Sequence, residues 1–109
     1  MEYERFGLTL MLRPSGELDL VAADQLRQVA DDLLARGRIQ HLYVNLERVE
    51  FLDSSFLGAL LGRYRKVAAA GGRMGLIRVP ASMRPFLEAA GLFRVLAEYE
   101  SELQALTAS

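Results

Sequence analysis

The sequence predicts an α/β domain with a mixed, mostly parallel β-sheet and about four α-helices. Short apolar segments of strand length alternate along the chain with longer segments of helical periodicity, and glycine or proline follows most of them. Strands that alternate with helices pair in parallel through crossovers, and an opening hairpin adds one antiparallel pair. With 109 residues, 51% of them apolar, the chain is expected to form one domain over residues 1–109.

The first third of the chain predicts a hairpin followed by a helix. Apolar residues alternate over residues 8–12, which is typical of a strand, and Pro14-Ser15-Gly16 predicts a turn into a return strand at residues 17–20. Apolar residues then recur at three- and four-residue steps, which predicts a helix over about residues 22–36. Gly37 is expected to end it.

The middle of the chain predicts a strand, a helix and a second strand. Residues 41–46 form a short apolar run with Tyr43 and Val44, which favour strands. A helix is expected over about residues 55–70, and Gly71-Gly72 follows it. Residues 74–79 predict the next strand, which Pro80 closes.

The last third predicts two helices with a strand between them. Ser82 is expected to cap a third helix, with Pro85 in its first turn and Gly91 at its end. Residues 93–96 predict a last strand. Residues 101–106 predict a short terminal helix, whose first and fourth residues match a capping box.

Composition excludes several classes of function. The formal net charge is −1 and both signs are scattered, so no surface for direct nucleic-acid binding is predicted. No apolar run approaches the roughly 20 residues of a membrane helix, and the start lacks the apolar core of a signal peptide. The chain has no cysteine, hence no disulfide or thiolate metal site. We expect a cytoplasmic protein without membrane contact.

No constellation of residues predicts catalysis, a metal site or a cofactor. His41, the one histidine, is expected to be exposed or hydrogen-bonded rather than catalytic. The glycine-rich residues 71–75 lie between a helix end and a strand, which is the wrong order for a phosphate-binding loop. The candidate carboxylate pairs, Asp31-Asp32 and Glu100 with Glu102, have ordinary surface spacings.

The turn Asp53-Ser54-Ser55, between a buried strand and a long helix, is the most informative segment. All three residues are good N-caps, so helix capping is one interpretation. Phosphorylation of a serine is the other. A phosphate there would accept bonds from free helix N–H groups and suit the positive end of the helix dipole. It would add a charge of about −1.5 to −2.

The helix that follows these serines has two different faces. On a wheel of about 100° per residue, the apolar positions form a predicted core stripe, made of Leu57, Leu60, Leu61, Tyr64, Val67 and Ala68. The opposite side carries Gly58, Gly62 and Ala69, flanked by Arg65 and Lys66. Each interior glycine costs about 1 kcal/mol relative to alanine, which indicates a strip cleared for close approach. The strip either packs under another element of the domain or docks a partner.

With these residues, the chain resembles the STAS family, and within it the bacterial anti-sigma factor antagonists, especially those of the sporulation sigma F system. The resemblance covers nearly the full length and rests on the order and spacing of motifs that are weak one by one. They are Gly16-Glu17-Leu18-Asp19, Asn45-Leu46, Phe51-Leu52-Asp53-Ser54-Ser55, Leu57-Gly58, Leu61-Gly62-Arg63-Tyr64, Gly71-Gly72 and Ala90-Gly91-Leu92-Phe93.

The resemblance implies a phosphorylation switch. The family's phosphorylated residue is the serine directly after the aspartate, here Ser54, with Ser55 as the alternative. The unphosphorylated protein would bind an anti-sigma factor that is also a serine kinase and so free a sigma factor for transcription. The kinase would use ATP to phosphorylate and release it, and a metal-dependent serine phosphatase would restore it. The expected partner-binding residues are Asp53, Ser55, Phe56, Gly58, Gly62, Arg65 and Lys66.

Phe56 departs from the family, which usually has glycine after the serine pair. Its ring is expected to obstruct the kinase, to anchor on the partner, or to tuck against the core beside Leu60 and Val67. Obstruction favours a second hypothesis, a STAS subunit of a signalling or lipid-transport assembly that is never phosphorylated. A third hypothesis, a small-ligand or nucleotide-binding module, is weakened by the lack of a phosphate loop.

Overall fold

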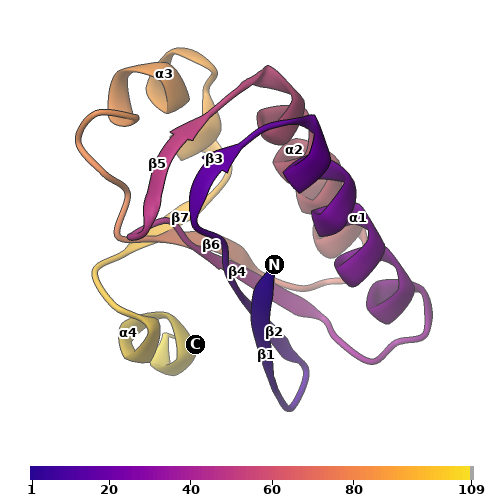
Figure 1. Cartoon of the computed structure of the whole chain (residues 1–109). Helices are drawn as coiled ribbons and strands as arrows, with labels where there is room; N and C mark the ends of the chain where they lie inside the picture. The colour runs from indigo at the N-terminus through magenta and orange to yellow at the C-terminus, as the bar shows by residue number, and fades with distance from the viewer. Residues whose placement is uncertain (109) are drawn as a thin grey trace.

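The computed structural model describes residues 1–108 and contains a five-stranded sheet with helices on both faces (Figure 1). The sheet has the strand order β1-β2-β4-β6-β7, with β1 antiparallel to β2 and the other neighbours parallel. The predicted α/β class is therefore confirmed. The elements are β1 (Glu2–Phe6), β2 (Thr9–Arg13), β3 (Gly16–Leu18), α1 (Leu20–Ala35), β4 (His41–Asn45), β5 (Val49–Leu52), α2 (Ser54–Ala69), β6 (Met74–Ile77), α3 (Arg84–Ala89), a 3₁₀ turn (Leu92–Arg94), β7 (Ala97–Tyr99) and α4 (Glu102–Thr107).

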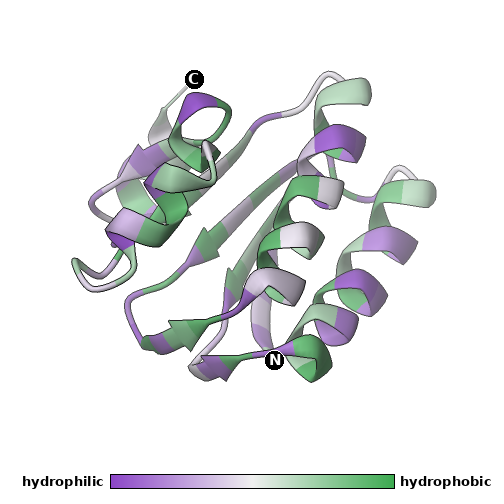
Figure 2. Ribbon diagram, turned by 90° about the horizontal axis from the view of Figure 1, so that it is seen from above, coloured by the Kyte–Doolittle hydropathy of each residue, from purple (hydrophilic) through white to green (hydrophobic). Residues whose placement is uncertain are grey.

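The two long helices lie side by side on one face of the sheet, and α4 covers the other face (Figures 1 and 2). Because side chains alternate along a strand, each central strand serves both layers. Leu42 and Val44 of β4 enter the main core under α1 and α2, whereas Tyr43 joins Met11 and Ala105 in a small cluster under α4. None of the helices in residues 1–108 combines the length and the hydropathy that a membrane-spanning segment needs.

The opening hairpin exists, and the strand predicted over residues 8–12 is confirmed as β2, but its hairpin partner is β1 and not the predicted return strand at residues 17–20. β1 pairs with β2 through a turn at Gly7, whose φ of 59° is one that glycine adopts without strain. β1 was missed because all five of its residues are exposed, so it lacks an apolar face of the usual kind. Arg13 holds this edge, since its guanidinium lies 2.9 Å from the Glu4 carboxylate.

The segment after Pro14 leaves the main sheet and forms a second one. β3 pairs in parallel with β5, and Leu18 lies opposite Leu52. The prediction that β3 returns along β2 was therefore wrong. β5 was not predicted, because its apolar pattern is too short to stand out: Val49 and Leu52 are buried and the two residues between them are exposed.

Helix boundaries agree with the predictions to within two residues, except near α3. α3 begins at Arg84, and Met83 precedes it without a side-chain cap, so the prediction of Ser82 as its N-cap was wrong. The predicted strand at residues 93–96 was also wrong. A 3₁₀ turn occupies its start, and β7 follows it at Ala97–Tyr99. Ser101 does cap α4, because its Oγ accepts the N–H of Gln104 at 3.0 Å.

Candidate functional site

Asp53 caps the helix that carries the serines. β5 ends at Leu52, and Asp53 has extended backbone with φ −105°. Its Oδ1 accepts the N–H of Phe56 at 3.1 Å, and its carbonyl accepts the N–H of Leu57 at 3.1 Å. The capping interpretation is thus correct for the turn, but the cap is the aspartate. Neither serine hydroxyl is needed to begin the helix.

Ser54 and Ser55 occupy the first two positions of α2. Ser54 is exposed and Ser55 is half-buried. The first backbone N–H groups of a helix have no partner within the helix, so an oxygen-rich group on Ser54 Oγ would lie next to free donors and the positive end of the dipole. Of the two serine hydroxyls, that of Ser54 is therefore the more accessible.

A second aspartate-capped helix begins next to this one. Asp19 Oδ1 accepts the N–H of Ala22 at 3.2 Å at the start of α1. The parallel pairing of β3 with β5 aligns the two strand ends, and the Asp53 N–H donates to the carbonyl of Leu18 at 3.0 Å. Both helix N-termini therefore meet at one corner. Sequence reasoning missed Asp19, although a Leu-Asp pair precedes both helices and could have identified it.

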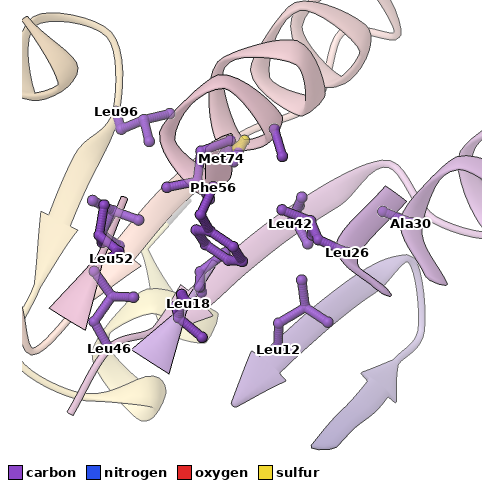
Figure 3. Close-up of a cluster of buried hydrophobic side chains, with 14 of the residues drawn as sticks. Leu12, Leu18, Leu26, Ala30, Leu42, Leu46, Leu52, Phe56, Met74 and Leu96 are labelled. Carbon is purple, nitrogen blue, oxygen red and sulfur yellow. The ribbon is translucent and has the colours of Figure 1, made fainter. Parts of the chain in front are cut away.

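Phe56 points into the main core. Its side chain is fully buried, and Figure 3 shows the ring directed from α2 into the cluster that includes Leu18, Leu42 and Leu52. The expectation that Phe56 contacts a partner is not compatible with this position, because no part of the side chain reaches the surface. The interpretation of a ring tucked against the core is therefore correct. The other two, an obstruction of the kinase and an anchor on the partner, lose their basis because the buried ring does not reach the surface.

The buried face of α2 differs from the predicted stripe. It is formed by Phe56, Ala59, Leu60, Arg63 and Val67. Leu57, Leu61 and Tyr64 are only half-buried, and Ala68 is exposed. The buried face is thus shifted from the predicted stripe towards Arg63, because α2 packs against α1 as well as against the sheet. An arginine was not expected to lie at this contact.

Arg63 is 6% exposed between the two long helices. Its Nε lies 3.0 Å from Asp31 Oδ1, and Lys66 Nζ lies 3.1 Å from Asp31 Oδ2. Burial lowers the pKa of the Arg63 guanidinium, and the negative charge of Asp31 acts against this shift. Within residues 1–108 the buried Nη1 of Arg63 has no hydrogen-bond partner. The negative charge of Asp31 therefore compensates the positive charge of Arg63, whose side chain is largely shielded from water.

The glycine strip of α2 is uncovered. A Cβ added to Gly58 or Gly62 would meet no atom of another element within 4 Å. Gly58, Arg65 and Ala69 are exposed, whereas Lys66 is directed to α1 by its pair with Asp31. Packing of the strip under another element of residues 1–108 is thereby excluded. The flat surface begins one turn beyond Ser54.

A groove of about 590 Å³ opens beside Ser54, between β5 and α3. It was not predicted, because its walls come from segments about 30 residues apart. Phe51 and Phe86, which line it, are 54% and 42% exposed. Its other lining residues are Glu50, Leu52, Asp53, Ser54, Ser82 and Met83.

Three of the four acidic residues considered as metal ligands have other partners. Asp31 pairs with Arg63 and Lys66, and Asp32 pairs with Arg36. Glu102 accepts hydrogen bonds from Arg13 and Asn45, and these bonds lower the pKa of its carboxyl group. In the part of the chain that the structure describes, no three histidine or acidic side chains are grouped as a metal site requires.

Residues 1–105 match the STAS domain, and the chain belongs to this family. An anti-sigma F factor antagonist from Paenibacillus polymyxa is 36% identical over 107 residues, which cover 98% of this chain and 92% of that protein. The structure of the anti-sigma factor antagonist SpoIIAA in its unphosphorylated form has a TM-score of 0.81 and 28% identity, covering 96% of this chain and 92% of that one. The Bacillus cell fate determinant SpoIIAA in its phosphorylated form has a TM-score of 0.81 and 31% identity, covering 96% and 95%.

Proposed function

We propose that this protein is an anti-sigma factor antagonist that phosphorylation of Ser54 switches off. It binds an anti-sigma factor that is also a serine kinase, and this binding frees a sigma factor for transcription in the cytoplasm. The names of its relatives point to sigma F as that factor. The observation that carries the proposal is an exposed Ser54 at the start of a helix that Asp53 already caps.

The switch works through a local change of charge. The kinase transfers the γ-phosphoryl group of ATP: a bond forms between Ser54 Oγ and phosphorus, the bond to ADP breaks, and the hydroxyl proton leaves to the kinase or to water. The phosphate brings a charge of about −1.5 to −2, beside a protein of formal net charge −1. A partner seated on Gly58 and Gly62 meets this charge at its edge and is expelled. A serine phosphatase reverses the change.

The fold tolerates such a change because Ser54 lies outside the core. The cap bond of Asp53 and the buried ring of Phe56 hold the helix start without it. The protein acts in this cycle as a binding partner and a substrate, without catalysis of its own. The second hypothesis, a STAS subunit that is never phosphorylated, depended on an obstructing Phe56, and the burial of that ring removes the reason to favour it.

Phosphorylation by the cognate kinase tests the proposal. The chain is incubated with the kinase and ATP, and the phosphate is mapped by mass spectrometry. We expect one phosphate on Ser54, which Ser54→Ala abolishes and Ser55→Ala retains. Absence of phosphate on the wild-type chain, or phosphate on Ser55 alone, contradicts the proposal.

Binding of the unphosphorylated chain provides a second test. Ser54→Asp should weaken binding to the anti-sigma factor while the circular dichroism spectrum stays unchanged. Ser15→Asp, which adds the same charge at an exposed serine before β3, is the matched control and should bind like the wild type. Equal affinity of Ser54→Asp and the wild type would show that charge at Ser54 is not the switch.

A further inference from the structure

The groove between β5 and α3 has an apolar floor and two exposed aromatic walls. Leu52 and Met83 are buried at 4% and 5% exposure, while the rings of Phe51 and Phe86 remain largely open to solvent. Large apolar side chains gathered around a hollow mark interaction sites more often than single exposed ones do. α3 is only six residues long, yet it presents Phe86 outward and buries Leu87.

The charged residues that line the groove are both acidic. Glu50 and Asp53 line it, and its remaining lining residues are apolar or serine. Arg84, the cation at the start of α3, is turned to Glu98 of β7 by a salt bridge. An occupant that is complementary to the groove therefore combines an apolar side chain with a neighbouring lysine or arginine.

Ser54 is itself part of the groove wall. An enzyme that brings ATP to Ser54 Oγ contacts this wall, which brings the surface of the enzyme to the edge of the groove. The uncovered glycine strip of α2 begins at Gly58, one helical turn beyond the same serine. The groove and the strip thus both adjoin Ser54.

We propose that the groove receives an apolar side chain of the serine kinase, flanked on the kinase by a basic residue, and that Phe51, Phe86 and Glu50 select the cognate kinase. This inference rests on the proposed function, because it names the partner of that same site. The groove contributes binding of the protein substrate and leaves the transfer step to the kinase. Its loss should therefore raise KM and leave kcat unchanged.

The experiment measures phosphorylation of Ser54 at varied concentrations of the chain. Phe86→Ala and Phe51→Ala should each raise KM about tenfold, the size of a binding hot spot. Phe6→Ala is the matched control, because Phe6 is 38% exposed on β1, at the far edge of the main sheet. Its KM should equal that of the wild type. Thermal unfolding of each variant checks that the variant is folded at the temperature of the kinetic assay.

Charge reversal tests the basic part of the partner. Glu50→Lys should raise KM, whereas Glu88→Lys, an exposed residue of α3 outside the groove lining, should not. If the wild type is phosphorylated on Ser54 and the groove variants keep its KM, the groove proposal is wrong and the proposed function stands. If the wild type is neither bound nor phosphorylated, both are wrong. If the free chain dimerises and Phe86→Ala makes it monomeric, the groove joins two copies and the kinase assignment is wrong.

Discussion

The carboxylate of Asp53 accepts the backbone N–H of Phe56 at 3.1 Å, and the ring of that same Phe56 is fully buried. These two residues flank Ser54 and Ser55 and fix both ends of the serine pair. The turn is thereby held by an interaction on each side that uses no serine hydroxyl. This arrangement separates the stability of α2 from the chemical state of Ser54.

Removal of the Asp53 cap should lower the stability of the protein, whereas removal of the Ser54 hydroxyl should not. Asp53→Ala is expected to lower the free energy of unfolding by about 1 kcal/mol, the usual value of an N-cap. Asp53→Asn retains an acceptor and should lose less. Ser54→Ala should change stability by less than about 0.5 kcal/mol, as expected of a surface position. Urea unfolding measures all three, and a larger loss in Ser54→Ala than in Asp53→Ala would contradict the capping role of Asp53.

The ring of Phe56 should account for a large share of the stability. Phe56→Ala is expected to cost about 3–5 kcal/mol, because it leaves a cavity in a well-packed core. Phe51→Ala, in which the ring removed is 54% exposed, is the matched control and should stay within about 0.5 kcal/mol of the wild type. Chemical unfolding compares the two, and similar losses would show that Phe56 is not buried as described.

The two glycines of the strip should oppose stability and favour binding. A Cβ at Gly58 or Gly62 meets no other element, so each alanine substitution should raise the free energy of unfolding by about 1 kcal/mol. The same substitutions should weaken binding to the anti-sigma factor.

Gly72→Ala is the contrasting variant, because its Cβ would lie 1.7 Å from the carbonyl oxygen of Gln40 and should destabilise the fold. Scanning calorimetry measures the stability of each variant, and titration calorimetry measures its affinity for the anti-sigma factor. Stabilised variants of Gly58 and Gly62 that bind with unchanged affinity would exclude the strip from the docking surface.

The stability of the fold should depend on Asp31, because Asp31 compensates the charge of the buried Arg63. Asp31→Ala is expected to cost about 3 kcal/mol, the lower end for a broken buried pair, since the side chain of Asp31 is 33% exposed. The double variant Asp31→Ala with Arg63→Met should recover most of this loss, because it removes the uncompensated charge. Unfolding in urea measures the cycle, and a double variant no more stable than Asp31→Ala would show that the buried charge is not the cause.

His41 should make stability depend on pH. Its Nδ1 accepts the N–H of Arg73 at 3.0 Å, and burial, with the nearby charge of Arg73, lowers the pKa of its imidazole. The folded protein therefore holds this proton less tightly than the unfolded chain. The contribution of neutral His41 to stability is fully present above the ordinary histidine pKa of about 6.5, and it is lost as the pH drops below that value.

Unfolding at about pH 7.5 and about pH 5.5 should show this loss. His41→Gln should reduce it, since His41 is the one histidine. Glu98 and Glu102, whose carboxyl pKa values are lowered by hydrogen bonds from Arg84 and Arg13, lose their charge only at lower pH. A pH dependence that is equal in His41→Gln and the wild type would contradict this origin.

Local pattern was enough to predict most of the elements. The three- and four-residue apolar steps of α1 and α2 and the apolar run of β4 each identify an element, because helix and strand periodicities arise from backbone geometry over a few residues. The exposed β1 and the short β7 were missed or misplaced, because their strand conformation depends on a neighbouring strand rather than on their own apolar pattern.

The sequence by itself determined the α/β class, the Asp-Ser-Ser turn at a helix start and the two glycines on one side of that helix. Only the tertiary structure decided that Phe56 is buried, that Arg63 faces Asp31 and that Phe51 and Phe86 line one groove. The physical reason is that a helical wheel orders residues around an axis but does not say which side the sheet and the neighbouring helix will occupy. That choice is made by contacts between segments distant in the chain, and it places Ser54 at the boundary of two surfaces.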